Sequence, residues 1–167
     1  MMENGFIYQT PLGTIVLTEN GSAITRLLFS AELPKEVNCA ETPLLKKAAQ
    51  QLQEYFAGTR KRFDLPLEPQ GTDFQQKVWQ ALQEIPYGGV CSYQDIARAI
   101  GNDNACRAVG GANNKNPIAI IIPCHRVVGT GGNLTGFGGG IRTKEALLKL
   151  EGMDMGRFYI PKKGTAL

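Results

Sequence analysis

The chain has 167 residues, enough for one small domain or for two closely packed half-size domains. Its content of 43% apolar and 20% charged residues excludes a disordered tail and indicates an ordinary buried core. The net charge of +3 is unevenly spread, since residues 1–71 carry −1 and residues 72–167 carry +4. We therefore expect an anionic partner to bind the second half, although ordinary surface variation explains this small asymmetry equally well.

Histidine and cysteine are too few and too scattered for a structural zinc site. His125 is the one histidine, and the four cysteines, Cys39, Cys91, Cys106 and Cys124, include no CxxC pair. The sequence therefore predicts no metal and no cofactor. It also shows no signal-peptide pattern and no long apolar run, which predicts a cytoplasmic protein with reduced thiols and no membrane contact.

The first 30 residues read as an antiparallel meander. Apolar, strand-like runs occupy residues 6–8, 14–17 and 24–29, and turns separate them at residues 11–13 and at Asn20-Gly21. An Asn-Gly pair between such runs is a strong hairpin signal.

A helix follows the meander. Thr42-Pro43 is a typical helix start, and Gly58 ends the apolar pattern that begins at Leu44. A short strand is expected over residues 63–67, and residues 68–71 read as a linker. This organisation predicts two domains, residues 1–70 and residues 71–167.

The second half is mostly helical. Thr72 and Gln75 form a capping box for a helix that stops at residues 86–89, and Ser92 caps a second helix that reaches about Ile100. A third helix is expected over residues 104–111, and the Gly-containing turn between the two short helices indicates a helix-turn-helix. Ala97 and Gly101 would provide the small residues that a tight helix crossing needs.

Two further elements complete the expected fold. Residues 118–122 form an apolar run that predicts a buried strand or extended segment. Thr143 is expected to cap a last helix that ends at Gly152.

Cys124 follows that apolar run and is next to the only histidine. A free thiol is mostly protonated near neutrality, so a nucleophilic cysteine needs a base, which here would be His125. An acid would orient the imidazole, and Glu151 in the last turn of the final helix is a candidate. The alternative is a buried structural cysteine beside a hydrogen-bonded histidine, and Cys-His adjacency alone favours that alternative.

Two more segments have a functional and an ordinary interpretation. The third helix consists mostly of Ala, Gly and Val with Arg107 nearly alone, so it could approach nucleic acid closely without reading much sequence; close packing in a core explains it equally well. Residues 129–140 contain seven glycines but no P-loop pattern. They are either a backbone wall for a flat polar ligand or a plain loop, and their position after Cys124-His125 favours the wall.

Together these motifs resemble the O6-alkylguanine-DNA alkyltransferase family, also called methylated-DNA–protein-cysteine methyltransferases. The resemblance is specific over residues 72–152 and rests above all on Pro123-Cys124-His125-Arg126-Val127 after an apolar run. The other matching motifs are Thr72-Asp73-Phe74-Gln75 with Val78-Trp79, Ile85-Pro86-Tyr87-Gly88, Ser92-Tyr93, Arg107-Ala108-Val109-Gly110, Asn116-Pro117, Gly136-Phe137-Gly138-Gly139-Gly140, Leu147-Leu148 and Glu151-Gly152.

The resemblance implies an α+β fold in two halves. A ribonuclease-H-like antiparallel sheet with a helix would precede a mostly helical part that holds the helix-turn-helix and the active-site cysteine loop. It also implies a DNA repair protein that acts once per molecule, because no residue could remove the alkyl group from Cys124 after transfer from O6-alkylguanine.

The resemblance also implies roles for individual residues. The third helix would bind the minor groove of duplex DNA, and the damaged guanine would be flipped out. Arg107 would fill the vacated space, and Tyr93 would crowd the phosphate backbone and help to bind the flipped base. His125 would take the thiol proton through a water, and Glu151 would orient His125. Asn116 would hold the turn between the DNA-binding helix and the active site. Phosphate contacts are expected from polar side chains at Gln75, Gln94, Asn102 and Thr130, and the base would lie against Phe137 and Gly138.

This chain departs from the family pattern in two places. Some members bind zinc in the first half, where this chain has only Cys39 and no histidine, so no zinc is expected. Many members have Tyr at the position of Phe137 and some have Ser at that of Gly138, which leaves the substrate range open.

The expected partner is double-stranded DNA that contains O6-alkylguanine, bound by a monomer, with cooperativity on DNA and activity on O4-alkylthymine left open. Two other classes of protein compete with the repair hypothesis: a lesion sensor that binds DNA without alkyl transfer, and a thiol hydrolase that uses Cys124 and His125.

Overall fold

The computed structural model describes residues 2–134, 137 and 139–160. The chain divides into two compact units. The first unit comprises the residues up to Gln70 together with Pro117–Ile121, and the second comprises Gly71–Asn116 and the chain from Ile122 onward. The short segment Pro117–Ile121 thus belongs with the first unit although it follows much later in the sequence. The division into domains 1–70 and 71–167 stays a prediction.

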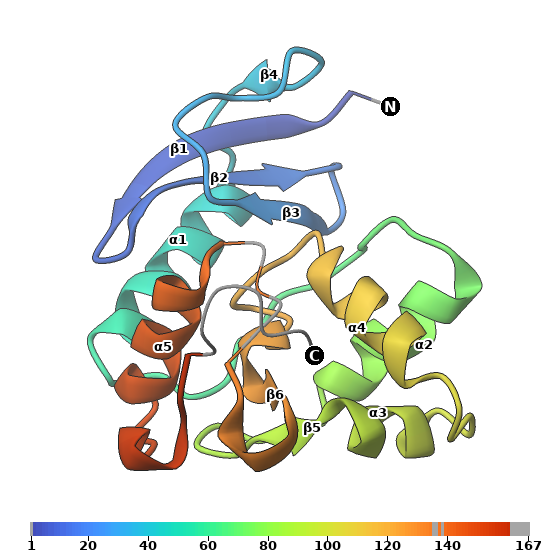
Figure 1. Ribbon diagram of the computed structural model, residues 1–167. Coiled ribbons are helices and arrows are strands. Elements are labelled where there is room, and N and C mark those ends of the chain that lie inside the picture. The colour runs from blue at the N-terminus through green and yellow to red at the C-terminus, as the bar shows by residue number, and fades with distance from the viewer. Residues whose placement is uncertain (1, 135–136, 138, 161–167) are drawn as a thin grey trace. The chain divides into compact units, whose positions relative to one another are not determined.

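The first unit is built on a four-stranded sheet with the order β3-β2-β1-β4 (Figure 1). Strands β1 (Asn4–Thr10), β2 (Gly13–Glu19) and β3 (Ile24–Leu28) pair antiparallel, which confirms the expected meander. A short strand, β4 (Asn38–Cys39), adds a parallel edge to β1 that the sequence pattern did not predict. β4 has only two residues, so it shows no alternation of apolar and polar residues from which a strand could be predicted.

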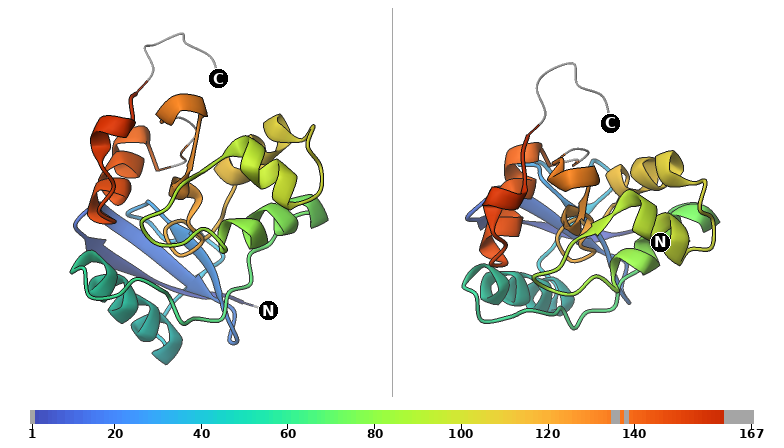
Figure 2. Two further views of the ribbon diagram at one scale, coloured as in Figure 1. Left: turned by 90° about the horizontal axis from the view of Figure 1, so that it is seen from below. Right: turned by 60° about the horizontal axis from the view of Figure 1, so that its bottom comes forward.

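Helix α1 (Pro43–Phe56) packs against β1, β2 and β3 of this sheet, as Figure 2 shows from two directions. The side chain of Thr42 caps the helix by accepting a hydrogen bond from the backbone N–H of Leu45, as expected. The helix buries an apolar face that includes Leu45, Ala48, Leu52 and Tyr55. Residues 63–67 do not form the expected strand, because only Leu67 bridges the sheet, at Ile24.

The segment after residue 116 is buried but is not the strand that its apolar run suggested. The backbone N–H of Leu27 donates to the carbonyl of Pro117 at 2.8 Å, and Ile118 bridges Leu27. Beyond that bridge Ile120 has φ +71°, a left-handed conformation that is rare for a β-branched residue. The chain therefore turns at Ile120 instead of extending along the sheet.

The second unit contains the expected helix-turn-helix. Helix α2 (Asp73–Leu82) begins with the predicted capping box, and α3 (Tyr93–Ala99) begins at the predicted cap Ser92. Helix α4 covers Cys106–Asn114 rather than residues 104–111, because the backbone N–H of Ala105 still closes the preceding turn by donating to Asn102. Contacts join α2, α3 and α4 to one another.

The turn between α3 and α4 corrects one expectation about small residues. Ala97 is fully buried, as a close helix crossing requires. Gly101 is exposed, and a Cβ atom added to it would meet nothing within 4 Å. Its φ of +78° gives the physical reason for a glycine, because the turn needs a left-handed residue and not a small packing residue.

The rest of the second unit consists of short elements and one longer helix. Strand β5 (Cys91–Ser92) pairs parallel with β6 (Val127–Val128), and the 3₁₀ turn η1 covers Cys124–Arg126. Two further 3₁₀ turns are η2 (Thr130–Gly132) and η3 (Met155–Arg157).

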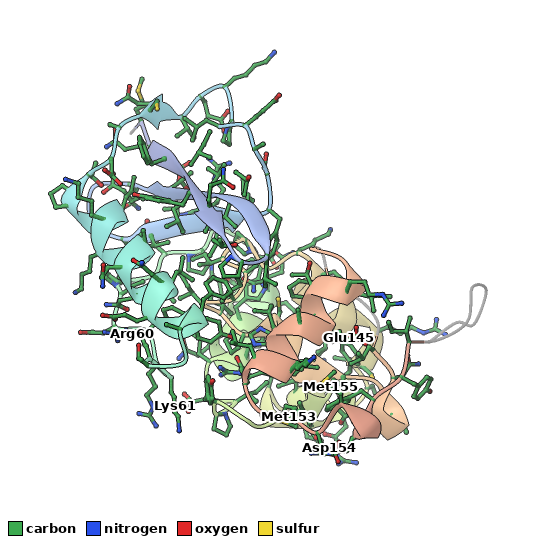
Figure 3. The ribbon with its side chains drawn as sticks, turned by 90° about the vertical axis from the view of Figure 1, so that its left-hand side faces the viewer. Arg60, Lys61, Glu145, Met153, Asp154 and Met155 are labelled. Carbon is green, nitrogen blue, oxygen red and sulfur yellow. The ribbon has the colours of Figure 1, made fainter. Side chains whose placement is uncertain are left out.

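Helix α5 covers Ile141–Leu150, and Figure 3 labels Glu145 on it and Met153–Met155 in the turn that follows it. The expectation that Thr143 caps this helix is wrong. The helix begins one turn earlier, where Gly140 adopts φ +99° and its carbonyl accepts the N–H groups of Thr143 and Lys144. None of the helices in the described part of the chain is long and apolar enough to cross a membrane.

Candidate functional site

Cys124 lies at the start of η1 in the second unit, with 4% of its surface exposed. The backbone around it is fixed by two asparagine side chains. Nδ2 of Asn113 donates to the carbonyl of Cys124 at 3.3 Å, and Nδ2 of Asn116 donates to the carbonyl of Ile122 at 2.8 Å. Asn116 therefore fixes the backbone two residues before the cysteine.

The thiol of Cys124 is a weak acid in this environment. Burial raises its pKa, while a hydrogen bond from the side chain of Asn116 and the positive charge of Lys144 act in the opposite direction. Because burial has the larger effect, the thiol keeps its proton near neutral pH. A nucleophilic role for Cys124 therefore needs a base close to it.

Next to the cysteine, His125 and Glu151 form a buried pair. Nε2 of His125 lies 2.8 Å from Oε2 of Glu151, and neither side chain is exposed. Arg126 completes the cluster, because its Nε and Nη2 donate to the two carboxylate oxygens of Glu151 at 2.8 and 2.9 Å. Burial alone would raise the pKa of Glu151, but the hydrogen bonds from His125 and Arg126 outweigh it and lower the pKa to about 2.

The ionised Glu151 determines which nitrogen of His125 carries the proton. Burial lowers the pKa of His125 in spite of the opposing carboxylate, so the imidazole is neutral near pH 7. A carboxylate only accepts hydrogen bonds, which assigns the proton to Nε2 and leaves the lone pair on Nδ1. Nδ1 is buried and has no hydrogen-bond partner among the described residues. It is therefore a free proton acceptor one residue away from the thiol.

Lys144 and Arg126 are site residues that the sequence interpretation left without a role. Nζ of Lys144 donates to the carbonyl of Val127 at 2.5 Å, and the side chain is fully buried. Burial lowers the pKa of Lys144 to about 8, although the nearby Cys124 raises it. Lys144 shares a helix face with Leu147, Leu148 and Glu151, and a lysine in such an apolar stripe is the signal that could have revealed it.

Arg126 is fixed by more than its carboxylate partner. Its Nη1 donates to the carbonyl of Ile85 at 2.8 Å, and its guanidinium lies 5.8 Å from the ring centroid of Tyr87. These contacts tie the loop after α2 to the cysteine turn. The signal in the sequence is the position of this arginine inside the motif Pro123–Val127, in which the sequence indicated roles only for the cysteine and the histidine.

An open cavity of about 980 Å³ lies beside α3 and α4. Four predicted DNA-contacting residues line it: Tyr93, Gln94, Arg107 and Thr130. The other lining residues are Ser92, Cys106, Gly110, Gly111, Asn114, Gly129, Asn133 and Tyr159. Cys124 is not among them, so the cavity wall and the buried thiol are separate parts of the same unit.

The remaining predicted contact residues lie elsewhere. Asn102 and Gln75 do not line this cavity, and the Gln75 side chain accepts the backbone N–H of Thr72 in the capping box. Phe137 is buried and does not line the cavity. Gly138 lies outside the described residues. Within the cavity, the side chain of Gln94 donates to the carbonyl of Asp103 at 2.9 Å.

The described part of the chain holds no cluster of three or more His, Cys, Asp or Glu side chains that could bind a metal ion.

Two family models cover nearly the whole chain. The model described as "6-O-methylguanine DNA methyltransferase, ribonuclease-like domain" matches residues 6–69. The model described as "6-O-methylguanine DNA methyltransferase, DNA binding domain" matches residues 73–153. Both halves of the expected fold, the ribonuclease-like sheet and the helical DNA-binding part, are thereby confirmed.

Individual relatives agree with this match. The constitutive methylated-DNA–protein-cysteine methyltransferase of Bacillus subtilis is 50% identical over 151 residues, which cover 86% of this chain and 92% of the relative. The enzyme of that name from Methanosarcina acetivorans is 47% identical, over 87% of this chain and 96% of its own. The crystal structure of Mycobacterium tuberculosis OGT in complex with DNA superposes with a TM-score of 0.83 at 46% identity, over 93% of this chain and 94% of that chain.

Proposed function

This chain belongs to the 6-O-methylguanine DNA methyltransferase family, and we propose that it repairs DNA by moving the alkyl group of O6-alkylguanine onto the sulfur of its own Cys124. The observation that supports this assignment most directly is the free Nδ1 of a neutral His125, held by Glu151 beside a buried cysteine. DNA is the partner that both the family and the solved relative in complex with DNA indicate.

The reaction begins with the proton of the thiol. Through one water, Nδ1 of His125 accepts the proton of Cys124, and the resulting imidazolium is balanced by the ionised Glu151 at 2.8 Å. The thiolate then attacks the alkyl carbon in line, so that a carbon–sulfur bond forms while the carbon–O6 bond breaks. Guanine leaves with the electron pair of that bond and takes up the proton that the imidazolium releases. Asn116 and Lys144 support the thiolate by a hydrogen bond and by charge.

The cavity beside α3 and α4 is the proposed place of contact with DNA. Flipping a damaged base costs a few kcal/mol of stacking and pairing, which contacts in the cavity must offset. Arg107 is exposed on α4 and lines the cavity, as a residue that fills the vacated space in the duplex must. Tyr93, at the start of α3, forms the neighbouring wall. Gln94, Asn102, Gln75 and Thr130 remain proposed phosphate contacts.

The proposal predicts a reaction that stops after one turnover, since a thioether on Cys124 is not removed by any neighbouring group. We would incubate the protein with an excess of duplex that contains O6-methylguanine. Product should plateau at one equivalent, and one methyl group should be found on the Cys124 peptide.

Two variants and two contrary outcomes make this experiment decisive. Cys124→Ala should lose transfer and keep DNA binding, while Cys39→Ala, which removes an exposed thiol in the first unit, should transfer normally. Continued turnover would instead favour a thiol hydrolase. Lesion binding by wild-type protein with an unmodified Cys124 would favour a damage sensor.

We also propose that the protein acts as a monomer in the cytoplasm. All four cysteines are free thiols, as a reducing compartment requires. Sedimentation velocity with and without duplex should give one protein per short lesion-bearing DNA; two or more per duplex would replace the monomer by a cooperative assembly.

A further inference from the structure

The segment after helix α5 presents one exposed aromatic ring at the cavity that binds DNA in the proposed function. Tyr159 is 51% exposed, and the other exposed large apolar side chains among the described residues, Met2 and Ile7, lie in the first unit. Tyr159 lines the same cavity as Tyr93 and Arg107. An aromatic side chain left this open to solvent beside a cationic residue is typical of a surface that stacks on nucleobases.

The backbone of Tyr159 is held firmly to the loop that follows the active site. Its N–H donates to the carbonyl of Gly132 at 3.0 Å, and its carbonyl accepts the N–H of Leu134 at 2.9 Å. Gly132 lies so close to this segment that a Cβ atom there would clash with the carbonyl of Arg157. Tyr159 is thus paired with the loop on the cavity side and is not a residue of a free tail.

The two neighbours of Tyr159 anchor the segment from the other side. Phe158 and Ile160 are partly buried and pack against a small core cluster that contains Val128, Leu134 and Leu148. In an extended segment successive side chains point to opposite sides. Because the side chains of residues 158 and 160 point toward the core cluster, the side chain of residue 159 points toward solvent. The outward ring is therefore a consequence of how the segment is fixed, and its position is preorganised.

We propose that Tyr159 is a DNA-contacting residue of this family member, whose ring stacks against the lesion-bearing strand where the flipped nucleotide leaves the duplex. The proposal rests on the proposed function, because it places the duplex, at the point where the damaged nucleotide is extruded, against the cavity lined by Tyr93 and Arg107. Bases that have lost their neighbours expose an apolar face, and aromatic rings stack on that face with little preference for sequence. Such a contact suits a protein that must accept a lesion in any sequence context.

The test separates binding from chemistry by single-turnover kinetics with protein in excess over O6-methylguanine duplex. Tyr159→Ala should raise the half-saturating protein concentration about tenfold and leave the limiting rate within about twofold, since stacking affects capture and not the attack by sulfur. Tyr159→Phe keeps the ring and should restore wild-type half-saturation. Ile7→Ala, which removes an exposed apolar side chain from the first unit, is the matched control and should change neither quantity.

Three outcomes would overturn the proposal: no effect of Tyr159→Ala, a fall in the limiting rate alone, or a loss in Tyr159→Phe as large as in Tyr159→Ala. Thermal unfolding of each variant shows whether the segment stays folded. If Tyr159→Ala unfolds, Tyr159→Leu replaces it, because leucine keeps apolar bulk on the segment but cannot stack as a ring, and the same tenfold increase is expected.

Failure of the proposed function would be seen separately from failure of this contact. Binding of the lesion duplex is measured by fluorescence anisotropy in the Cys124→Ala background, with and without Tyr159→Ala. If wild-type protein transferred no methyl group, the proposed function would be lost, but a tenfold weaker binding in the double variant would still support Tyr159. Equal binding of the two proteins would reject Tyr159 whatever the chemistry.

Discussion

Nε2 of His125 lies 2.8 Å from Oε2 of Glu151, although 26 residues separate them in the sequence and both side chains are fully buried. Arg126 donates to both oxygens of the same carboxylate. The carboxylate therefore stays ionised, and the imidazole keeps its lone pair on Nδ1, which has no hydrogen-bond partner among the described residues. The pair makes a neutral base available in a buried site, which is what a protonated, buried Cys124 needs in order to act as a nucleophile.

Glu151→Gln should slow alkyl transfer about 100-fold, because a neutral amide cannot balance the imidazolium that forms when His125 takes the thiol proton. It should also lower the free energy of unfolding by about 3–5 kcal/mol, because Arg126 is left buried without its anionic partner. Single-turnover rates and urea unfolding measure the two effects. Glu145→Gln is the matched control, since Glu145 lies on the same helix (Figure 3) and its ion pair among the described residues is with the exposed Arg142. A variant at Glu151 that reacts as fast as this control would remove Glu151 from the mechanism.

Acid should destabilise the protein through Glu151 as the pH falls from about 4.5 toward 2. The pKa of this carboxyl is about 2 in the folded protein and has an ordinary value of 4.5, so its ionised form stabilises the fold by on the order of 3 kcal/mol at neutral pH. Because the folded pKa is the lower one, this contribution is complete above about pH 4.5 and is lost as the pH falls toward 2. Carboxyl ¹³C NMR of labelled glutamate should show Glu151 still ionised at pH 3. A midpoint near 4.5 would mean that His125 and Arg126 do not hold the charge.

Lys144→Met should slow transfer about tenfold at pH 7, since the thiolate of Cys124 loses a neighbouring cation and the carbonyl of Val127 loses its donor. Lys144 has a pKa of about 8, so it is charged below that pH and loses its charge above it. The ratio of wild-type to variant rate should therefore fall as the pH rises past 8. Lys149→Met, at an exposed position of the same helix, should match wild type throughout. A constant ratio from pH 6 to pH 9 would argue that Lys144 only holds the backbone.

Arg107→Ala should slow repair of O6-methylguanine duplex at least tenfold, because nothing else on α4 is long enough to fill the space of a flipped base. Affinity for undamaged duplex should fall much less, since only one positive charge is lost. Arg142→Ala removes an equally charged and highly exposed side chain from α5 and is the control. Stopped-flow fluorescence of a base analogue next to the lesion would follow the flipping step itself. Unchanged flipping and repair rates would refute the assigned role of Arg107.

Local signals in the sequence predicted most of the fold of each unit. The Asn20-Gly21 turn, the caps at Thr42, Thr72 and Ser92, and the alternation of the first strands are short-range features, so the elements that they define appear where expected. Elements without such signals were missed or misread. β4, β5 and β6 are two residues each, and residues 118–122 are apolar like a strand but turn at Ile120.

The chemical identity of the site could be read from the sequence, but its geometry could not. Pro123–Val127 with a single histidine in the chain points to one nucleophile and one base. Arg126 and Lys144 were overlooked because charged residues are normally exposed, and only the packed structure shows them buried against Glu151 and Val127. Tyr159 carries no motif at all, and its exposure depends on neighbours that pack inward.

The sequence by itself determined the family, the helices and strands with strong local signals, and the proposed nucleophile and base, Cys124 and His125, because motifs and periodicity are properties of neighbouring residues. The tertiary structure decided everything that depends on distant residues meeting. It placed Glu151 and Arg126 on His125, buried Lys144 near Cys124, and left Tyr159 open on the cavity with Arg107. Burial and charge at these contacts set the pKa values of the site, and no pattern along the chain specifies those values.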